Sequence, residues 1–261
     1  MKATLITGAS GGIGEGFARR LAGEKHNLVL VARSEEKLRK LCDVLMAKHQ
    51  ITAHYVAVDL IDLGADERLF KETEQHGMEI DWLINNAGFG SMGDFAKLGL
   101  EKEREIIDLN ISALVALTHR YLQKMRERKC GTIINVSSAA GFQPIPFMAT
   151  YAATKAFVTA FTEAIAEENR PFGIKVMALC PGSTKTNFFT ASNIERPLQV
   201  KGQQTVEEVV ETAMNAVGRG KSKVVSGWVN YLGAIAGAYA PNALTTRAIG
   251  NALRSKFQAK E

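Results

Sequence analysis

The chain has 261 residues, a formal net charge of +5, 46% hydrophobic residues and 23% charged residues, a composition typical of a folded globular protein. This length suits one hydrophobic core, so we expect a single domain over residues 1–261. No stretch reaches 18 apolar residues, so we expect no integral membrane segment. The first predicted strand begins at once, so we expect no signal peptide. No nucleic-acid-binding motif accompanies the positive charge, so we expect no nucleic-acid partner.

Cysteine and histidine usage indicates neither a disulfide framework nor a metal site. The three cysteines, Cys42, Cys130 and Cys180, are odd in number and far apart, which favours a reducing, cytoplasmic environment. Cys130 and Cys180 flank strand-like runs, and we expect both thiols to be buried and unreactive. The five histidines form no metal-binding motif, and we predict no metal.

Short apolar runs alternate with amphipathic stretches along the chain. This alternation predicts an α/β fold, a single Rossmann-type doubly wound parallel sheet with helices on both faces. Seven strands are expected, at residues 3–6, 28–31, 55–58, 82–84, 132–136, 175–179 and 223–226. Helical spacing of apolar residues is clearest over 35–48 and 101–126. Ligands of such folds bind outside the carboxyl ends of the strands, so the segments that follow each strand are candidate binding segments.

A glycine-rich segment follows the first strand and precedes an amphipathic helix. Gly8, Gly12 and Gly14 have the spacing Gly-x-x-x-Gly-x-Gly rather than the commoner Gly-x-Gly-x-x-Gly. Glycines at such a turn let the backbone approach a pyrophosphate, which the helix N-terminus favours electrostatically. The segment therefore predicts a dinucleotide site, with candidate contacts at Thr7, Gly8, Ser10, Gly12, Ile13 and Gly14.

The residues after the second strand bear on the choice of dinucleotide. NAD-preferring folds usually place an acidic residue here for the ribose 2′-hydroxyl, whereas an arginine accommodates a 2′-phosphate. Ala32 stands where the acid would be, and Arg33 follows it. A guanidinium binds phosphate through charge-assisted, bidentate hydrogen bonds. We therefore expect NADP rather than NAD. The alternative is that Arg33 is a solvated residue at the start of a helix that Ser34 caps.

Tyr151 and Lys155 lie one turn apart on the same face of a predicted helix. An ammonium near a phenol favours the phenolate, so Lys155 is expected to lower the pKa of Tyr151 from its reference value of about 10. Such a shift moves the phenol toward the pKa that an acid or base needs at neutral pH. Tyr-x-x-x-Lys alone is too common to establish a site, and the surrounding motifs decide its interpretation.

The chain after residue 187 is predicted to shape a substrate site. Over 187–206 no long periodic pattern persists, and a loop of this length is often a mobile lid over a pocket. Phe188 and Phe189 would line an apolar pocket or belong to the core of a short helix. Residues 227–261 form a predicted C-terminal helical extension. Five large residues in it would pack on the sheet or on a neighbouring subunit, or would extend the pocket wall: Trp228, Tyr231, Leu232, Ile235 and Tyr239.

The motifs occur in a specific order along the chain. The glycine turn is followed by Asn85-Asn86-Ala87-Gly88, Asn110, Ser138, Tyr151-x-x-x-Lys155 and Pro181-Gly182. This set resembles the short-chain dehydrogenase/reductase family, in the form with a Ser-Tyr-Lys-Asn catalytic group. The resemblance runs from residue 1 to about 190. Segments 85–90 and 140–144 resemble those of one branch of the family, which includes 3-oxoacyl and 17β-hydroxysteroid-type reductases.

The resemblance implies an enzyme that interconverts a carbonyl and a secondary alcohol by hydride transfer with NADP(H). Tyr151 would donate its proton to the carbonyl oxygen, and Ser138 would hydrogen-bond that oxygen. Lys155 would lower the pKa of Tyr151 and hold the nicotinamide ribose. Asn110 would lie at a helix kink whose freed carbonyl holds a water linked to Lys155. Ser137 is a rival for the serine role, but Ser138 has the family spacing of thirteen residues to Tyr151.

The resemblance also implies further cofactor contacts and an assembly. The adenine end would be met by Asp59, Leu60, Asn86, Ala87 and Gly88, and the nicotinamide end by Pro181, Gly182, Thr184 and Thr186. On sequence alone, Asp59 is equally a turn or cap residue. Family members commonly form homodimers or homotetramers through helices near 101–126 and 151–170. The expected partner is a small carbonyl or alcohol substrate of hydrophobic character.

Two other interpretations stay open at this point. One is a non-catalytic NADP-binding regulator or scaffold with the same fold. The other is a reductase of 3-oxoacyl chains that works at a membrane surface.

Overall fold

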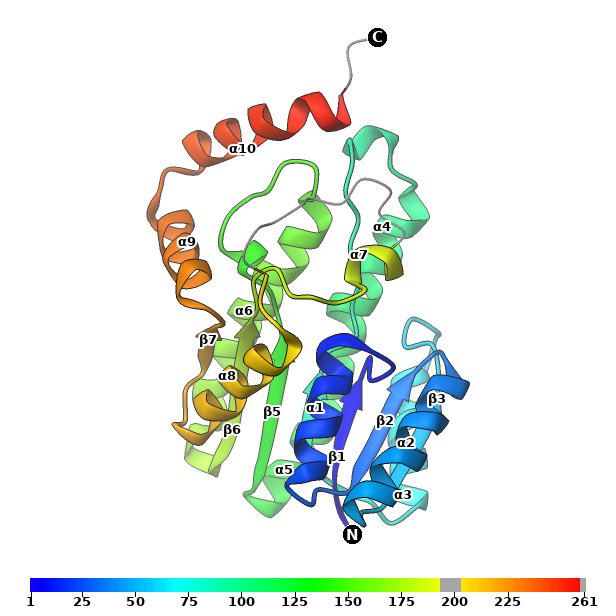
Figure 1. The fold of residues 1–261 in the computed structure, drawn as a ribbon. Coiled ribbons are helices and arrows are strands. Elements are labelled where there is room, and N and C mark those ends of the chain that lie inside the picture. The colour runs from blue at the N-terminus through cyan, green and yellow to red at the C-terminus, as the bar shows by residue number, and fades with distance from the viewer. Residues whose placement is uncertain (193–202, 259–261) are drawn as a thin grey trace.

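The computed structural model describes residues 1–192 and 203–258, and a parallel β-sheet forms its centre (Figure 1). Over these residues seven strands lie in the order β3-β2-β1-β4-β5-β6-β7. The strands are β1 (Lys2–Thr7), β2 (Leu28–Ala32), β3 (Ala53–Ala57), β4 (Glu79–Asn85), β5 (Gly131–Val136), β6 (Ile174–Cys180) and β7 (Lys223–Val225). The order reverses between β1 and β4, which creates the switch point where open α/β sheets bind ligands. The predicted Rossmann-type doubly wound sheet is confirmed.

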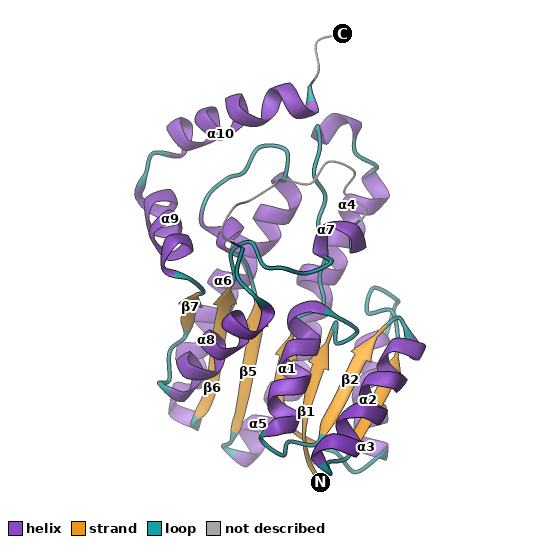
Figure 2. Cartoon of the chain, viewed as in Figure 1, coloured by secondary structure: helices purple, strands orange, loops and turns teal. Residues whose placement is uncertain are grey.

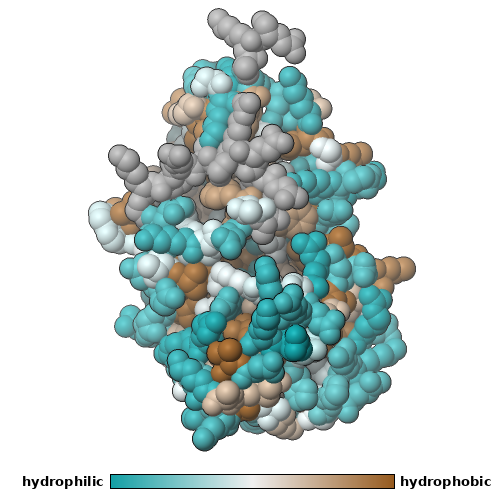
Figure 3. All heavy atoms as spheres, turned by 45° about the vertical axis from the view of Figure 1, so that its right-hand side comes forward, coloured by the Kyte–Doolittle hydropathy of each residue, from teal (hydrophilic) through white to brown (hydrophobic). Residues whose placement is uncertain are grey.

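Helices cover both faces of this sheet (Figure 2). One face carries α1 (Gly12–Gly23), α2 (Glu35–His49) and α8 (Val206–Gly218), which share one hydrophobic cluster. The other face carries α3 (Ala65–Gln75), α5 (Leu114–Arg128) and α6 (Ala149–Asn169), which share a second cluster, with α4 (Leu100–Ile107) packed beside α6. Because the helices turn their apolar sides to the sheet, polar side chains remain outside. The side of the molecule that bears the β3 edge is accordingly mainly hydrophilic (Figure 3).

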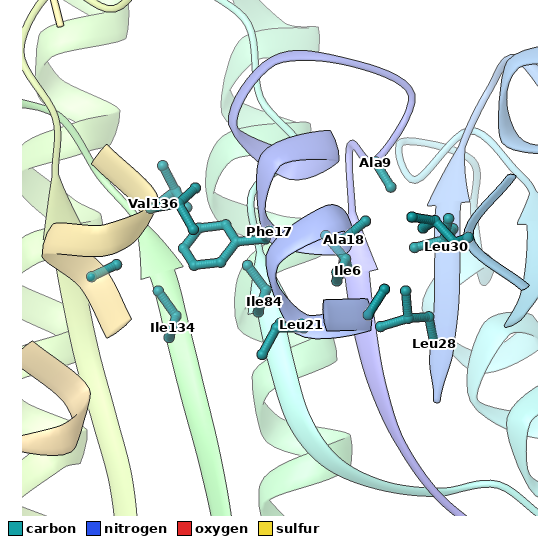
Figure 4. Packing of buried hydrophobic residues seen from close by; sticks show 14 of the residues in the cluster. Ile6, Ala9, Phe17, Ala18, Leu21, Leu28, Leu30, Ile84, Ile134 and Val136 are labelled. Atoms are coloured by element: carbon teal, nitrogen blue, oxygen red, sulfur yellow. The ribbon is translucent and has the colours of Figure 1, made fainter. Parts of the chain in front are cut away.

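Core residues of α1 pack against side chains near the carboxyl ends of the strands. Successive strand residues point to opposite faces, so Leu5 and Ile6 of β1 enter different clusters, and both are fully buried. Figure 4 shows Phe17 of α1 pointing toward Val136 at the end of β5. Burial of one such aromatic side chain contributes about 1.5–3 kcal/mol. This packing fixes the position of the glycine turn that precedes α1.

Every strand differs from its predicted limits by one or more residues, and β4 begins at Glu79 rather than at residue 82. β3 covers Ala53–Ala57 rather than 55–58, because β2 pairs along its whole length with that segment, from Leu28 opposite Ala53 to Ala32 opposite Ala57. The helix predicted over 101–126 is interrupted by a π-helical turn at Asp108–Ala113, between α4 and α5. Such turns shift the hydrogen-bond ladder to i→i+5 and often occur at functional sites.

The cysteines divide into two kinds. Cys42 and Cys180 are buried, and burial raises the pKa of each thiol to about 11. The prediction of a buried Cys130 is wrong: this residue is exposed, because it lies in the turn between α5 and β5.

Three helices lie beyond the sheet, next to the carboxyl ends of its strands (Figure 1). They are α7 (Phe188–Ala191), α9 (Trp228–Tyr239) and α10 (Asn242–Phe257). α9 packs against β7 and the 3₁₀ turn at Ala139–Phe142. In α10, the Phe257 ring stacks on Phe147 with 5.3 Å between centroids. Among the helices described, none is both long and apolar enough to cross a bilayer.

Candidate active site

A cavity of about 450 Å³ lies beyond the carboxyl ends of the strands. Ten of the candidate catalytic and cofactor-binding residues line it, and they come from segments far apart in the chain: Ile13, Asn86, Gly88, Ser138, Tyr151, Lys155, Pro181, Gly182, Thr184 and Thr186. Ser137, the rival serine, lines it as well. The fold therefore gathers the glycine turn, the end of β5, the start of α6 and the loop after β6 around one space.

The β1–α1 turn is held by hydrogen bonds from the end of β4. The buried Thr7 hydroxyl accepts from the backbone N–H groups of Asn86 (2.9 Å) and Ala87 (3.0 Å). The Asn86 side-chain amide donates back to the carbonyls of Thr7 (3.0 Å) and Gly8 (3.2 Å). Gly8 has φ +64°, and a Cβ there would lie 2.9 Å from the Cα of Ala87. Only glycine fits this turn without moving the backbone.

The glycine turn fits a pyrophosphate. α1 begins at Gly12, and its N-cap residue, Gly11, provides no side-chain hydrogen bond to the first turn. The first N–H groups of a helix have no partner inside the helix, and they attract negative charge. Ser10, Ile13 and Gly14 belong to the same turn, where phosphate oxygens could accept from the backbone. The residues present therefore match the dinucleotide expected from the sequence.

Arg33 and Asp59 lie together at the carboxyl ends of β2 and β3. Nη1 of Arg33 is 3.6 Å from Oδ2 of Asp59, and the Arg33 side chain is 74% exposed. An exposed pair of this kind contributes little to stability, so the guanidinium can turn to a phosphate at small cost. Oδ1 of Asp59 also accepts from the N–H of Ile61 (3.3 Å), so Asp59 does act as a turn residue. Leu60 packs against the sheet core.

Tyr151 and Lys155 are both buried, with 8% and 5% of their surfaces exposed. Nζ of Lys155 donates to the carbonyl of Val136 (2.9 Å) and lies 5.8 Å from the centre of the Tyr151 ring. Burial raises the pKa of Tyr151, and a hydrogen bond with Ser138 opposes that rise. The predicted lowering of this pKa by Lys155 is wrong: burial sets the direction of the shift, and Ser138 is the group that opposes it. Burial also lowers the pKa of Lys155 to about 8.

The two adjacent serines have different surroundings. The Ser137 hydroxyl donates to the carbonyl of Lys155 (2.7 Å) and lies 2.7 Å from the hydroxyl of Thr159, so it is bound to α6. The Ser138 hydroxyl accepts from the N–H of Ala140 (3.1 Å) and faces Tyr151. Ser138 thus has a hydroxyl directed at the phenol, whereas Ser137 anchors the helix that carries it.

Asn110 lies in the π-helical turn, which takes the place of the predicted kink. Its side chain accepts from the N–H of Phe89 (3.2 Å), donates to the carbonyl of Phe89 (3.0 Å) and donates to Thr154 (3.1 Å). Gly88 lies between Asn110 and Lys155, since a Cβ there would be 2.8 Å from Oδ1 of the former and 3.4 Å from Nζ of the latter. Asn110 therefore positions the 88–90 backbone beside the buried ammonium.

The loop after β6 carries Pro181, Gly182, Thr184 and Thr186. The Thr184 hydroxyl donates to the carbonyl of Gly182 (3.1 Å). The Thr186 hydroxyl accepts from the N–H of Phe188 (3.3 Å), and its methyl group lies against the glycine turn at Gly12. This loop therefore reaches across the cavity from the β6 end to the start of α1.

Asn230 is a site residue that the sequence analysis missed. Its amide donates to the carbonyl of Ser226 (2.8 Å) and to Gln204 (3.3 Å), and it packs so closely on Gly182 that a Cβ there would lie 2.2 Å away. It thereby links α9 to the loop after β6. The signal that could have found it is its place as the single amide in an otherwise apolar, uncharged helix, Trp228–Tyr239.

The far wall of the cavity is apolar. Phe188 and Phe189 line it, and the Phe188 ring lies 5.4 Å from the Tyr151 ring, centre to centre. Other apolar wall residues, which the sequence did not single out, are Met92, Ile145, Met148, Val229 and Ala234. Tyr151 therefore has apolar neighbours in the cavity as well as polar ones. Part of the lid predicted for 187–206 lies outside the described residues.

Two of the three placements predicted for the large residues of the C-terminal helix are wrong, and packing on a neighbouring subunit stays a prediction. The large residues of α9 line neither the cavity nor the sheet, and 39–86% of their surface is exposed: Trp228, Tyr231, Leu232, Ile235 and Tyr239. The opposite side of the helix, with Val229, Asn230, Gly233 and Ala234, lines the cavity instead. The residues of α9 that face the protein are small, and this lets the helix backbone come close to the neighbouring loop. At Gly237, for example, an added Cβ would lie 2.5 Å from the Gln143 side chain.

Comparison with known proteins agrees with this geometry. A family model described as short chain dehydrogenase matches residues 2–197. The chain is 32% identical to a very-long-chain 3-oxoacyl-CoA reductase of Rattus norvegicus, over 82% of this chain and 68% of that protein. It is 32% identical to a 7beta-hydroxysteroid dehydrogenase of Mediterraneibacter gnavus, over 85% of each. Among solved structures, a short-chain dehydrogenase from Sphingobium yanoikuyae in complex with NADPH superposes with a TM-score of 0.81 at 28% identity, covering 100% of this chain and 98% of that one.

Proposed function

Because this chain belongs to the short-chain dehydrogenase/reductase family, an oxidoreductase family, we propose that it interconverts a carbonyl and a secondary alcohol on a hydrophobic substrate with NADP(H). The observation that carries the proposal is the meeting of Ser138, Tyr151 and Lys155 in one cavity whose wall also includes apolar side chains such as Phe188 and Phe189. A cavity with a few convergent polar groups and perturbed pKa values is the expected form of an active site.

Tyr151 is the proposed proton donor. Its raised pKa keeps the phenol protonated at neutral pH, so it can give its proton to a carbonyl oxygen that lies within hydrogen-bonding distance. Ser138, directed at the same hydroxyl, would donate a hydrogen bond to that oxygen and stabilise the charge that develops on it. A bound nicotinamide supplies the hydride in reduction or accepts it in oxidation.

Lys155 has two proposed tasks. With a pKa of about 8 it is still mainly protonated at pH 7, so its ammonium can stabilise negative charge left on the Tyr151 oxygen. It would also donate to the hydroxyl groups of the nicotinamide ribose. Asn110 is proposed to assist indirectly, by holding the 88–90 backbone beside this ammonium.

NADP is the proposed cofactor, and one set of residues would hold it. The relative from Sphingobium yanoikuyae binds NADPH, and Arg33 is exposed at the end of β2, where a 2′-phosphate would be met. The proposed contacts are Thr7, Gly8, Ser10, Gly12, Ile13, Gly14, Arg33, Asp59, Leu60, Asn86, Ala87, Gly88, Tyr151, Lys155, Pro181, Gly182, Thr184 and Thr186.

The change Arg33→Ala tests this preference. It should weaken NADPH binding by about 1.5–3 kcal/mol, the contribution of a hydrogen bond to a charged group, and leave NADH binding nearly unchanged. Titration of each cofactor followed by fluorescence measures both affinities. An equal loss for the two cofactors would show that Arg33 does not contact the 2′-phosphate.

The activity itself is tested by a substrate panel. Purified protein and NADPH are mixed with ketones of graded chain length and bulk, including a 3-oxoacyl thioester and a ketosteroid, and the NADPH absorbance is followed. We expect faster consumption with the larger apolar ketones, because the cavity wall is apolar. Tight NADPH binding without consumption of any carbonyl, or reduction of NADP by any alcohol, would favour the non-catalytic regulator or scaffold instead.

A homodimer or homotetramer is proposed as the working assembly. Apolar side chains are partly exposed on the helices that family members commonly use for association, including Ile107 (43%) and Phe157 (41%). Light scattering coupled to size exclusion measures the mass in solution. A monomer at micromolar concentration would contradict this part of the proposal.

A further inference from the structure

The outer side of α9 is an exposed apolar stripe. Trp228, Tyr231, Leu232, Ile235 and Tyr239 recur at helical spacing, and their exposed fractions are 76%, 51%, 55%, 39% and 86%. We call these five residues the α9 stripe. The helix contains no charged residue. Contiguous exposed apolar surface of this kind marks an interaction site more often than chance.

The helix that carries the stripe is firmly packed on its other side. Ala234 and Gly237 are buried, and the amide of Asn230 is hydrogen-bonded to Ser226 and Gln204. The orientation of α9 is therefore fixed by its inner contacts. The stripe faces outward because the small residues of the helix, rather than the large ones, fit against the protein.

The segment that carries the stripe has charges of one sign. Residues 227–258 include Arg247, Arg254 and Lys256 but not one of the 27 aspartates and glutamates of the chain. α10 follows α9 directly, and Arg247 and Arg254 are exposed on it. The two helices lie together at one end of the molecule (Figure 1), whereas the surface on the side of the β3 edge is mainly hydrophilic (Figure 3).

We propose that α9 and α10 form a docking surface for an anionic lipid bilayer. An interfacial helix buries an apolar face at the headgroup boundary while basic residues meet anionic lipids. Tryptophan and tyrosine, three of the five stripe residues, are the side chains enriched at that boundary. None of the described helices can cross a bilayer, so the protein would lie on the membrane rather than span it.

A second copy of the chain is a less suitable occupant of this surface. Symmetric pairing would place this surface against itself, and residues 227–258 hold no acidic residue that could pair with Arg247 or Arg254. Like charges at such an interface oppose association. Anionic lipid complements both the apolar stripe and the arginines.

The cavity opens beside this surface. Val229 and Gly233 line the cavity and are also exposed, so they lie where the inner side of α9 meets its outer side. On a docked molecule this opening would lie next to the lipid. If the proposed function holds, an apolar substrate could pass from the bilayer into the cavity without crossing water.

Vesicle sedimentation with the full chain tests the docking directly. We expect binding to vesicles of mixed phosphatidylglycerol and phosphatidylcholine, and at least tenfold weaker binding to phosphatidylcholine alone. The triple change Trp228→Ser, Leu232→Ser and Tyr239→Ser should weaken binding at least tenfold. The matched control is Leu63→Ser, at a residue that is 98% exposed on another part of the surface, and it should bind like the unchanged protein.

A second readout reports the depth of the helix in the lipid. Trp228 is one of two tryptophans, so a Trp82→Phe background leaves it as the sole reporter. Its emission should shift to shorter wavelength on anionic vesicles. Arg247→Gln with Arg254→Gln should weaken binding and flatten its dependence on salt concentration.

Several outcomes would overturn the proposal. These are no vesicle binding, binding that the triple change leaves intact, or concentration-dependent self-association that the triple change abolishes while vesicles are ignored. The last result would assign the stripe to a second copy. Because these measurements involve neither cofactor nor substrate, their failure would leave the proposed oxidoreductase function standing.

Discussion

The dinucleotide side of the cavity and its substrate side are made of different parts of the polypeptide. On the dinucleotide side, backbone groups and a few polar side chains are locked together, as when Thr7 accepts from two N–H groups at the end of β4. On the substrate side, apolar side chains from α7 and α9 and their neighbouring loops form the wall. At Gly8 the first arrangement has no room for an added Cβ, whereas a wall of apolar side chains can change shape by exchanging one apolar residue for another.

This difference suggests a division of tasks. A site that binds one fixed cofactor benefits from rigid backbone geometry, while a site that selects substrates benefits from a wall that varies. Tyr151 lies at the boundary, with Ser138 on one side and Phe188 on the other. Variants on either side should therefore fail in different ways.

The largest effect is expected at the shared boundary. Ser138→Ala should reduce kcat by about 10²–10³-fold, the usual loss when one donor to a developing oxyanion is removed. Its neighbour Ser137 is the matched control, since its hydroxyl binds the carbonyl of Lys155. Ser137→Ala should lower the free energy of unfolding by about 1 kcal/mol and change kcat less than tenfold. Steady-state kinetics and chemical denaturation separate the two, and reversed effects would exchange the roles of the serines.

Lys155→Met should stabilise the fold while it damages activity. The pKa of Lys155 falls from 10.5 to about 8 in the folded protein, which corresponds to about 3 kcal/mol of destabilisation at pH 7. The variant also loses the hydrogen bond from Lys155 to the Val136 carbonyl, which lowers its stability by about 1 kcal/mol. We therefore expect a net gain of about 2 kcal/mol in the free energy of unfolding.

The stability difference between Lys155→Met and the original protein depends on pH. Below pH 8 the ammonium is protonated in both states, so the full penalty is present. Between about pH 8 and 10.5 the folded protein releases this proton first, so the original protein becomes more stable relative to Lys155→Met as pH rises. Urea denaturation of both proteins at pH 7 and pH 10 measures the difference, and a constant difference would mean that Lys155 is not desolvated.

Two glycine-to-alanine substitutions, one on the dinucleotide side of the cavity and one on the substrate side, compare how much room each backbone has. Gly8→Ala should destabilise the protein by about 2 kcal/mol, because φ is +64° and the added Cβ would meet Ala87. Gly233→Ala, in α9, meets no atom within 4 Å and should stabilise the helix by roughly 0.5–1 kcal/mol. Thermal unfolding gives both values. Equal destabilisation at the two positions would contradict the proposed contrast in rigidity.

The sequence predicts the dinucleotide side well and the substrate side poorly, and the reason is physical. Glycines, amides and short strands constrain the backbone locally, so the turn at Gly8 and the segment after β4 could be placed from their own residues. Asn230 contacts Gly182, 48 residues earlier in the chain; its place as the single amide of α9 marks it as unusual but does not indicate which residue it contacts.

Two further predictions failed because they depended on tertiary placement. Large apolar residues normally turn a helix inward, but in α9 the small residues pack inward and the α9 stripe faces out. The spacing of Tyr151 and Lys155 correctly placed both on one helix and in one cavity. It could not show that the Lys155 ammonium would donate to Val136 and that burial would dominate the pKa of Tyr151.

The central claim is that Tyr151 donates the proton at a site where the cofactor is held independently. The most direct test compares Tyr151→Phe with the unchanged protein, using NADPH titration and turnover of the best ketone from the panel. We predict that NADPH still binds and that kcat falls by about 10²–10⁴-fold, the contribution of general acid catalysis. A variant that keeps more than about a hundredth of the rate would contradict the claim.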